Sequence, residues 1–100
     1  MFEHKIEVSG RIVTLRPYTE KRMKLLTEVN KEIAEFVKSN PDMRLDDVPA
    51  KKKAGWWMRK ASILWKAEPE LGEDFFTDEN FESSRLKESE DFFMSRRLYL

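Results

Sequence analysis

Hydrophobic and polar residues alternate along the first eight positions, and this alternation predicts a half-buried β-strand. Ser9-Gly10 follows as a two-residue turn that leads into a second strand. Such a turn pairs Val8 with Arg11 and Ile6 with Val13, and it gives the hairpin one apolar face: Ile6, Val13 and Leu15. Because an isolated hairpin is marginal in water, we expect this face to rest on helices or on a sheet from another copy or partner.

The apolar spacing then changes to three and four residues, which predicts an amphipathic helix that ends near Ser39. Pro17 ends the second strand because proline has no N–H to donate, and Thr19 is expected to cap the helix. Asn40-Pro41 stops the helix. We expect this helix to lie at the centre of the fold.

A second helix is predicted over residues 49–68 and a third from near Asp78 to the C-terminus. Asp46 or Asp47 is expected to cap the second helix, and Thr77 the third. These elements predict an α+β fold in a single domain of residues 1–100. Its hairpin occupies residues 1–17 and packs on about three helices within residues 18–100.

The composition is that of a foldable, soluble chain, since 38% of the 100 residues are charged and 40% are hydrophobic. No apolar run approaches the roughly 20 residues needed to cross a bilayer, and the first residues lack the apolar stretch of a signal peptide. The absence of cysteine removes disulfides and thiolate chemistry. We therefore expect a cytoplasmic protein with no membrane partner.

Charge is distributed unevenly along the chain although the net charge is zero. Residues 1–66 carry 15 Lys or Arg against 9 Asp or Glu, whereas residues 67–100 carry 4 against 10. This asymmetry favours contacts either within one molecule or head to tail between copies. We expect a homo-oligomer in which the Trp56 region of one copy meets the Phe92-Phe93 region of the next.

Catalytic and metal-binding patterns are absent from the sequence. His4 is the single histidine and lies on the apolar face of the first strand, so a packed or edge histidine is the favoured interpretation. Asp78, Asn80 and Glu82 have the spacing that begins a calcium loop, but Ser83 stands where that loop requires glycine. We therefore expect a protein that is not an enzyme and that holds no metal or cofactor.

The segment KKKAGWWMRKASILWK combines cations with indole rings. Its cations are candidates for binding nucleic acid, with the tryptophans stacking on bases: Lys51, Lys52, Lys53, Arg59 and Lys60. The same helix could lie on an anionic membrane surface. We favour a core helix, because Trp57 and Trp65 share a stripe with Ala61 and Leu64, and this interpretation leaves Trp56 for a protein-binding groove.

Two pairs of adjacent phenylalanines extend this interpretation to the last third of the chain. Neighbouring helical residues point about 100° apart, so both members of a pair cannot enter one narrow core stripe. Aromatic residues outside a small core are typical interface anchors. The candidate partner-binding residues are Trp56, Trp57, Phe75, Phe76, Phe92 and Phe93.

The segment VSGRIVTLRPYTEKRMKLL, within residues 4–37, resembles the N-terminal region of bacteriophage tail assembly chaperones. It is also similar to the small baseplate hub assembly proteins of contractile-tailed phages. The shared features are a short ribbon with a glycine turn, a strand that ends in Arg16-Pro17-Tyr18, and a charged helix. The Trp-rich helix and the acidic last third lie outside the resemblance.

The resemblance implies a non-enzymatic virion-assembly chaperone or scaffold that binds a phage tail structural protein, either the tape measure or a baseplate component. It implies a structural role for Arg16, Pro17 and Tyr18 at the strand-to-helix junction. Two alternatives remain: a protein-binding inhibitor of a host enzyme, and a nucleic-acid-binding module that uses the helix over residues 49–68.

Overall fold

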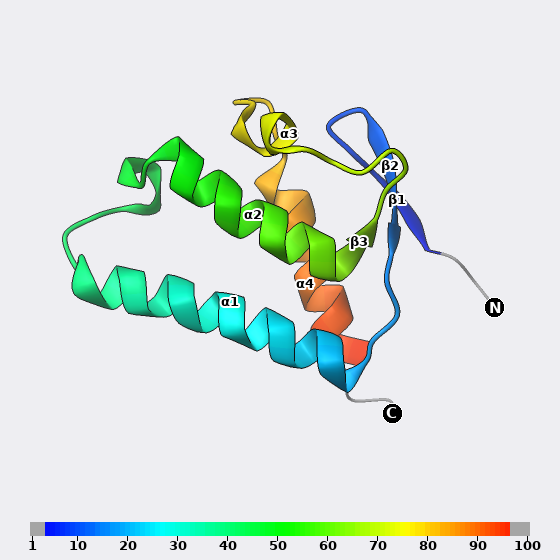
Figure 1. The fold of residues 1–100 in the computed structure, drawn as a ribbon, viewed down its shortest axis with the longest axis horizontal. Helices are drawn as coiled ribbons and strands as arrows, with labels where there is room; N and C mark the ends of the chain where they lie inside the picture. Colours follow the sequence, from blue (N-terminus) through cyan, green and yellow to red (C-terminus); the bar gives the residue numbers. More distant parts are fainter. Residues whose placement is uncertain (1–3, 97–100) are drawn as a thin grey trace.

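A computed structural model describes residues 4–96, and it places a small sheet at one end of a group of helices (Figure 1). The elements in chain order are β1 (Lys5–Val8), β2 (Arg11–Leu15), α1 (Glu20–Ser39), the short 3-10 helix η1 (Leu45–Asp47), α2 (Ala50–Leu64), β3 (Trp65–Lys66), α3 (Glu73–Thr77) and α4 (Ser83–Arg96). This arrangement confirms the predicted α+β class.

The N-terminal hairpin forms with the predicted register. Ile6 pairs with Val13 and Val8 with Arg11, and both residues of the turn have positive φ angles, 48° at Ser9 and 85° at Gly10. A two-residue turn of this kind matches the twist of the strands that it joins. Val8 and Val13 are fully buried on the inner face. The expected apolar face of the hairpin therefore covers the core.

A third strand, β3, was not predicted. Trp65 pairs with Leu15 and Lys66 with Thr14, so the sheet has the order β1-β2-β3 and the edge of β2 is covered. The helix predicted to reach Glu68 therefore ends at Leu64. Arg16 explains the early end, because its backbone N–H donates to the carbonyl of Leu64 at 2.8 Å and its Nε donates to the carbonyl of Trp65 at 3.1 Å.

Helix α1 begins as predicted, with the hydroxyl of Thr19 accepting the backbone N–H of Arg22 at 3.1 Å. It ends at Ser39, and the side-chain amide of the following Asn40 donates to the carbonyl of Phe36 at 2.8 Å. The prediction that this helix is central was wrong. Helix α2 occupies that place, because it contacts α1, α3, α4 and β3 (Figure 1).

Two of the predicted caps were wrong because local hydrogen bonds use these side chains elsewhere. The carboxylate of Asp47 accepts the backbone N–H of Arg44 at 3.2 Å in η1, and Pro49 precedes α2 without a side-chain cap. Thr77 is the last residue of α3, and its hydroxyl donates to the carbonyl of Glu73 at 3.2 Å. Helix α3 was not predicted, and α4 starts at Ser83 rather than near Asp78.

A single hydrophobic core joins the hairpin to the helices. Its buried members come from every main element except the 3-10 helix: Val8, Val13, Met23, Leu26, Val29, Ala54, Ala61, Ile63, Leu64, Trp65, Phe76, Leu86 and Phe93. The hairpin turn is also fixed to the start of α4, since Ser9 and Glu82 exchange two hydrogen bonds of 2.9 and 3.0 Å. The surfaces described below therefore belong to one packed body.

Candidate protein-binding surfaces

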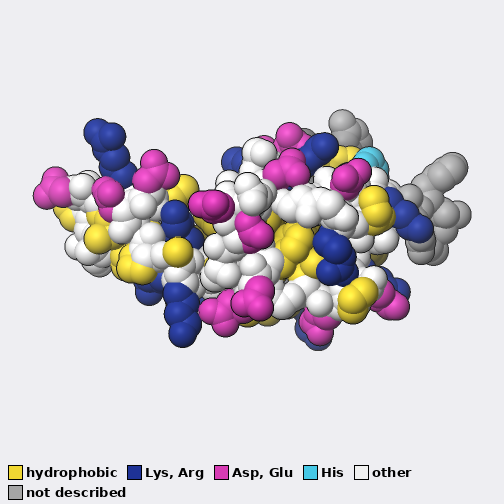
Figure 2. Space-filling model, turned by 90° about the horizontal axis from the view of Figure 1, so that it is seen from above, with side chains coloured by type: hydrophobic (Ala, Val, Ile, Leu, Met, Phe, Trp, Pro, Cys, Tyr) yellow, Lys and Arg dark blue, Asp and Glu magenta, His cyan; other side chains and the backbone are white. Residues whose placement is uncertain are grey.

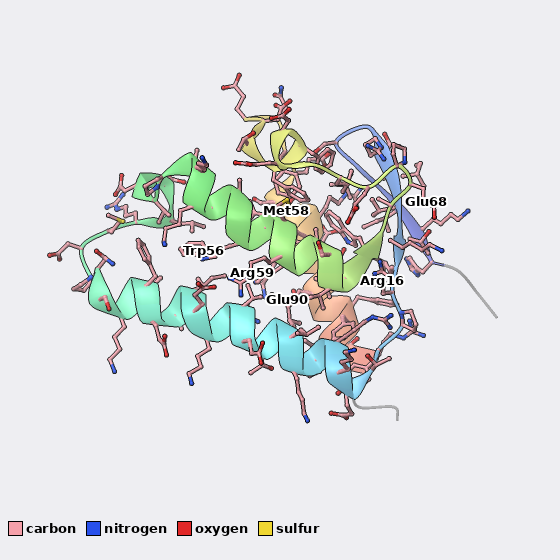
Figure 3. The ribbon with its side chains drawn as sticks, viewed as in Figure 1. Arg16, Trp56, Met58, Arg59, Glu68 and Glu90 are labelled. Atoms are coloured by element: carbon pink, nitrogen blue, oxygen red, sulfur yellow. The ribbon has the colours of Figure 1, made fainter. Side chains whose placement is uncertain are left out.

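The tryptophans of α2 are placed differently from the sequence prediction. Trp56 is 3% exposed and lies between α2 and α1 (Figure 3), with its ring centroid 5.3 Å from that of Phe36. Lys52 covers the same pair, its Nζ lying 4.9 Å from the Phe36 ring. Trp57 is only partly buried. Trp57 therefore offers surface to a partner, whereas Trp56 is a packing residue in this conformation.

Trp65 is buried by a polar contact as well as by packing. Its indole Nε1 donates to the hydroxyl of Ser89 at 2.8 Å, and that hydroxyl donates to the carbonyl of Arg85 at 2.8 Å. Indole N–H groups usually find a partner when they are buried. This contact ties β3 to the middle of α4.

Lys60 is a buried member of the predicted nucleic-acid set. Its Nζ lies 3.0 Å from Oε2 of Glu90, and the two side chains are 11% and 7% exposed. The amide of Asn30 donates to the same Glu90 oxygen at 3.0 Å, so one polar network joins α1, α2 and α4. Lys60 is therefore committed to an internal ion pair and is removed from any phosphate-binding surface.

The remaining cations of this set divide into two groups. Arg59 pairs with Glu32 of α1 (Figure 3 labels Arg59). Lys51, Lys52 and Lys53 occupy the first turn of α2, where Lys51 and Lys52 are exposed and Lys53 is half-buried. Of these five cations, only the three in the first turn of α2 form no ion pair within residues 4–96. The alternating row of exposed cations and indole rings on which bases could stack does not form along α2.

Each phenylalanine pair places one ring in the core and the other closer to solvent. Phe76 is 5% exposed and packs with the half-buried Phe75 and with Phe81, at centroid distances of 5.1 and 5.2 Å. Phe93 is 2% exposed and contacts Tyr18, whereas Phe92 is 36% exposed. Of the predicted partner-binding phenylalanines, Phe75 and Phe92 thus have accessible surface.

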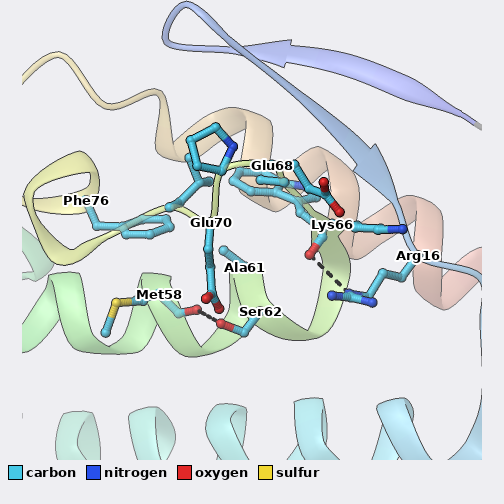
Figure 4. Close-up of a pocket in the computed structure, with 12 residues that line it drawn as sticks. Arg16, Met58, Ala61, Ser62, Lys66, Glu68, Glu70 and Phe76 are labelled. Atoms are coloured by element: carbon cyan, nitrogen blue, oxygen red, sulfur yellow. Dashed lines mark hydrogen bonds between the residues drawn. The ribbon is translucent and has the colours of Figure 1, made fainter.

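A pocket of about 450 Å³ lies between α2 and the segment from β3 to α3, and we call it the α3 pocket (Figure 4). The apolar part of its wall comes from Met58 and Ala61 of α2 and from the buried rings of Trp65 and Phe76. Charged residues of both signs stand around it: Arg16, Lys66, Glu68 and Glu70. The pocket can hold an apolar side chain beneath a charged rim.

Arg16 is held at this rim by a hydrogen bond to the backbone. Its Nε is fixed by the carbonyl of Trp65 at 3.1 Å, while its two Nη groups have no hydrogen-bond partner within residues 4–96 (Figure 4). Glu70 extends across the pocket toward Ser62 in the same view. The exposed Ser62 hydroxyl donates to the carbonyl of Met58 at 2.9 Å. Arg16 is thus positioned to bind a carboxylate.

A smaller pocket of about 300 Å³ separates α2 from the first half of α4. Trp57 and Leu45 line it together with the Lys60–Glu90 pair and Leu86. Lys87, also in its lining, donates to Asp91 at 2.8 Å, and this hydrogen bond raises the pKa of Lys87 above its usual range. Apolar surface therefore also reaches solvent beside α4.

Exposed apolar residues also gather at the connection between α1 and α2. Val37 is 50% exposed, Met43 37% and Leu45 51%, and we call these three residues the connector patch. Figure 2 shows hydrophobic side chains between charged ones on the lobe that this connection forms.

The residues with calcium-like spacing serve the fold instead. Oδ1 of Asp78 accepts the backbone N–H of Asn80 at 2.8 Å, and Oε1 of Glu82 accepts the backbone N–H of Ser9. Within residues 4–96 no group of three His, Asp or Glu side chains is arranged to hold a metal ion. His4 packs against Phe92, with ring centroids 5.0 Å apart.

Sequence reasoning missed the α3 pocket because its walls come from three separate segments. Glu68 and Glu70 flank Pro69, and this segment was interpreted only as the end of a helix. The available signal in the sequence was the pair of carboxylates on either side of Pro69, together with the Arg16-Pro17 step that ends the second strand. Nothing in the periodicity indicated that Arg16 would meet this segment.

None of the helices in the described part of the chain is both long and apolar enough to cross a lipid bilayer. No protein-family model, curated protein or solved structure matches the chain.

Proposed function

We propose that the protein is a non-enzymatic assembly chaperone or scaffold that binds a phage tail structural protein, the tape measure or a baseplate component, in the host cytoplasm. The α3 pocket is the observation that carries this proposal. Its volume of about 450 Å³ and its aromatic wall suit an anchor side chain of a protein partner. The opening resemblance supplies the class of partner.

The rim of the pocket defines what the partner segment should look like. A bulky apolar residue would fill the space between Met58 and Phe76, and a carboxylate beside it would bind the two Nη groups of Arg16. A cation on the other side of the anchor would meet Glu68 or Glu70. Charges of both signs fix the direction of a bound segment and reject neutral alternatives.

Filling the pocket tests the proposal without touching the core. Ser62 is exposed and lines the α3 pocket, so Ser62→Trp should occupy it and abolish binding to the tail structural protein. Ser95→Trp is the matched control, because Ser95 is also an exposed helical serine whose hydroxyl bonds to a backbone carbonyl, that of Phe92. Its binding should equal that of the parent chain.

The measurement is co-expression of each variant with a tape measure protein or a baseplate protein, followed by the soluble yield of that protein and titration calorimetry of the purified pair. Binding that persists in Ser62→Trp would contradict the use of this pocket. Absence of binding to every tail structural protein, together with inhibition of a host enzyme, would favour the inhibitor alternative.

A further inference from the structure

The first turn of α2 contradicts the usual rules for a helix N-terminus. Pro49 precedes the helix and gives no side-chain hydrogen bond to it, and the first turn contains no acidic residue. Lys51, Lys52 and Lys53 instead place three positive charges where the helix dipole is already positive. Local conflicts of this kind are expected at functional sites.

This turn is continuous in sequence with the connector patch. Val37, Met43 and Leu45 lie within the residues that lead into α2, and the buried Val48 follows them. We call the connector patch together with Lys51, Lys52 and Lys53 the basic end. It combines half-exposed apolar side chains with three lysines, and the exposed Asp42, Asp46 and Asp47 lie on the same connection, where the cations of residues 37–53 outnumber them.

A complementary surface lies on the same molecule. Residues 73–79, here the acidic segment, carry four exposed carboxylates and no Lys or Arg: Glu73, Asp74, Asp78 and Glu79. None of the four forms an ion pair with another residue in the described range 4–96. The half-buried ring of Phe75 supplies apolar surface among them.

The start of α2 and helix α3 both lie on the upper side of the molecule in Figure 1, which is the side that faces the viewer in Figure 2. In Figure 2, positive and negative side chains both project from the lobe at the α1–α2 connection, and further negative side chains stand over the neighbouring part of the molecule. The lysines of the basic end form no ion pair with a carboxylate within residues 4–96. Within one chain, therefore, the lysines of the basic end and the carboxylates of the acidic segment do not pair with each other.

We infer that two copies of this chain pair through this face, with the basic end of each copy on the acidic segment of the other. A two-fold axis satisfies both contacts at once, because the same face carries both members of the complementary pair. Carboxylates of the second copy then neutralise the first turn of α2. Charge sets the register, and the connector patch against Phe75 supplies apolar contact.

This contact differs from the oligomer expected from the sequence, which joined the Trp56 region to Phe92-Phe93. Trp56 and Phe93 are buried, whereas the basic end and the acidic segment are accessible. The two sites adjoin at Phe76, which lies in the acidic segment and lines the α3 pocket, but Ser62 and Arg16 belong to neither pairing surface and the three carboxylates to be changed do not line the pocket. A variant that blocks one site therefore leaves the other to be measured.

Two charge-reversed variants of the full chain test the pairing. The basic-end variant carries Lys51→Glu, Lys52→Glu and Lys53→Glu, and the acidic-segment variant carries Glu73→Lys, Asp74→Lys and Glu79→Lys. Light scattering coupled to size exclusion should give a dimer for the parent chain and a monomer for either variant alone. An equimolar mixture of the two variants should recover the dimer, because both contacts are then again between opposite charges.

Matched controls separate this contact from a general effect of charge. Lys21→Glu, Lys24→Glu and Lys31→Glu change the net charge of the chain equally on exposed positions of α1, and this variant should remain a dimer. Circular dichroism confirms that each variant is folded, and the recovery of dimer in the mixture requires folded chains. The parent dimer should weaken between about 0.01 M and about 1 M salt, as the Debye length falls from about 30 Å to about 3 Å.

A parent chain that stays monomeric at low salt overturns the inference. Dimers that survive in either reversed variant, or a mixture that stays monomeric, also overturn it. A mass that keeps growing with protein concentration would replace the closed pair with an open chain and would contradict the two-fold arrangement.

Discussion

Two buried polar contacts connect α4 to the rest of the molecule. One is the hydrogen bond from the Trp65 indole to Ser89, and the other is the ion pair between Lys60 and Glu90. Both join residues that lie at least 24 positions apart in the sequence. Each contact fixes the position of α4 more specifically than apolar packing does, because a misplaced helix would leave polar atoms without partners.

Replacing Ser89 by alanine should leave the buried indole N–H of Trp65 without an acceptor. We expect Ser89→Ala to lower the free energy of unfolding by about 1–3 kcal/mol, the usual cost of such a group. Urea denaturation measures it. Ser95→Ala is the control, since Ser95 is exposed and should change stability by less than about 0.5 kcal/mol. Equal effects of the two substitutions would contradict the role of this hydrogen bond.

Replacing only Glu90 of the Lys60–Glu90 pair should lower the free energy of unfolding more than replacing both residues by apolar ones. Glu90→Leu leaves the Lys60 ammonium buried with no carboxylate, and we expect a loss of about 3–5 kcal/mol in unfolding free energy. Lys60→Met combined with Glu90→Leu should restore part of this loss, because a hydrophobic pair has no charge to desolvate, whereas the Asn30 amide loses its acceptor in both variants.

The exposed ion pair of Arg59 and Glu32 serves as the comparison for the buried Lys60–Glu90 pair. Both side chains are about half exposed, at 49% and 51%, so Glu32→Gln should change stability by less than about 1 kcal/mol. Urea denaturation of all four proteins completes the measurement. A double variant as unstable as Glu90→Leu alone would show that packing, rather than the buried charge, determines the loss.

Helix α2 shows which residue positions could be predicted from the sequence and which could not. Ala61, Leu64 and Trp65 were correctly assigned to the core from their spacing, whereas Trp57 of the same stripe is only partly buried. Trp56 was assigned to a groove but is buried, because α1 packs its Phe36 against that side of α2. The burial of Lys60 was also unpredictable, since its partner Glu90 is distant in sequence and no local pattern marks a buried lysine.

Gly55 and Gly10 have different backbone conformations, so alanine at these two positions should change the stability in opposite directions. Gly55 lies inside α2 with no atom within 4 Å of an added Cβ, so alanine there should stabilise the helix by about 0.5–1 kcal/mol. Gly10 has φ +85° in the hairpin turn, where alanine should cost about 1–2 kcal/mol. Thermal unfolding of the two single variants measures opposite shifts. A loss of stability in Gly55→Ala would mean that α2 does not tolerate a methyl group on that side.

Element boundaries were predictable where local chemistry decides them. The Ser9-Gly10 turn and the Thr19 cap depend on neighbouring residues only, and both were confirmed. The end of α2 depends on Arg16, whose Nε donates to the carbonyl of Trp65, 49 positions away in the sequence. The hydrophobic periodicity continues through Trp65, so it predicted a longer helix and did not indicate β3. Helix α3 is too short to show a period, and its formation depends on the burial of Phe76.

Across the whole molecule, the opposite charges of the two sequence regions rarely meet. Of the ion pairs within residues 4–96, only Lys60–Glu90 links a cation before residue 67 to a carboxylate after it. The expectation that the two regions attract each other is therefore met at one buried site. The other charges remain on the surface, where a second copy or a partner can use them.

Salt should consequently affect folding and association differently. Exposed pairs contribute about 0–1 kcal/mol each, and a buried pair is screened much less than an exposed one. We expect the unfolding free energy of the monomeric basic-end variant, measured in urea by tryptophan fluorescence, to change by less than about 1 kcal/mol between about 0.1 M and about 1 M salt. Urea is suitable because it carries no charge. A loss of several kcal/mol would instead show that long-range attraction between the basic and acidic regions stabilises the fold, and the charges assigned to pairing would then already be used within each chain.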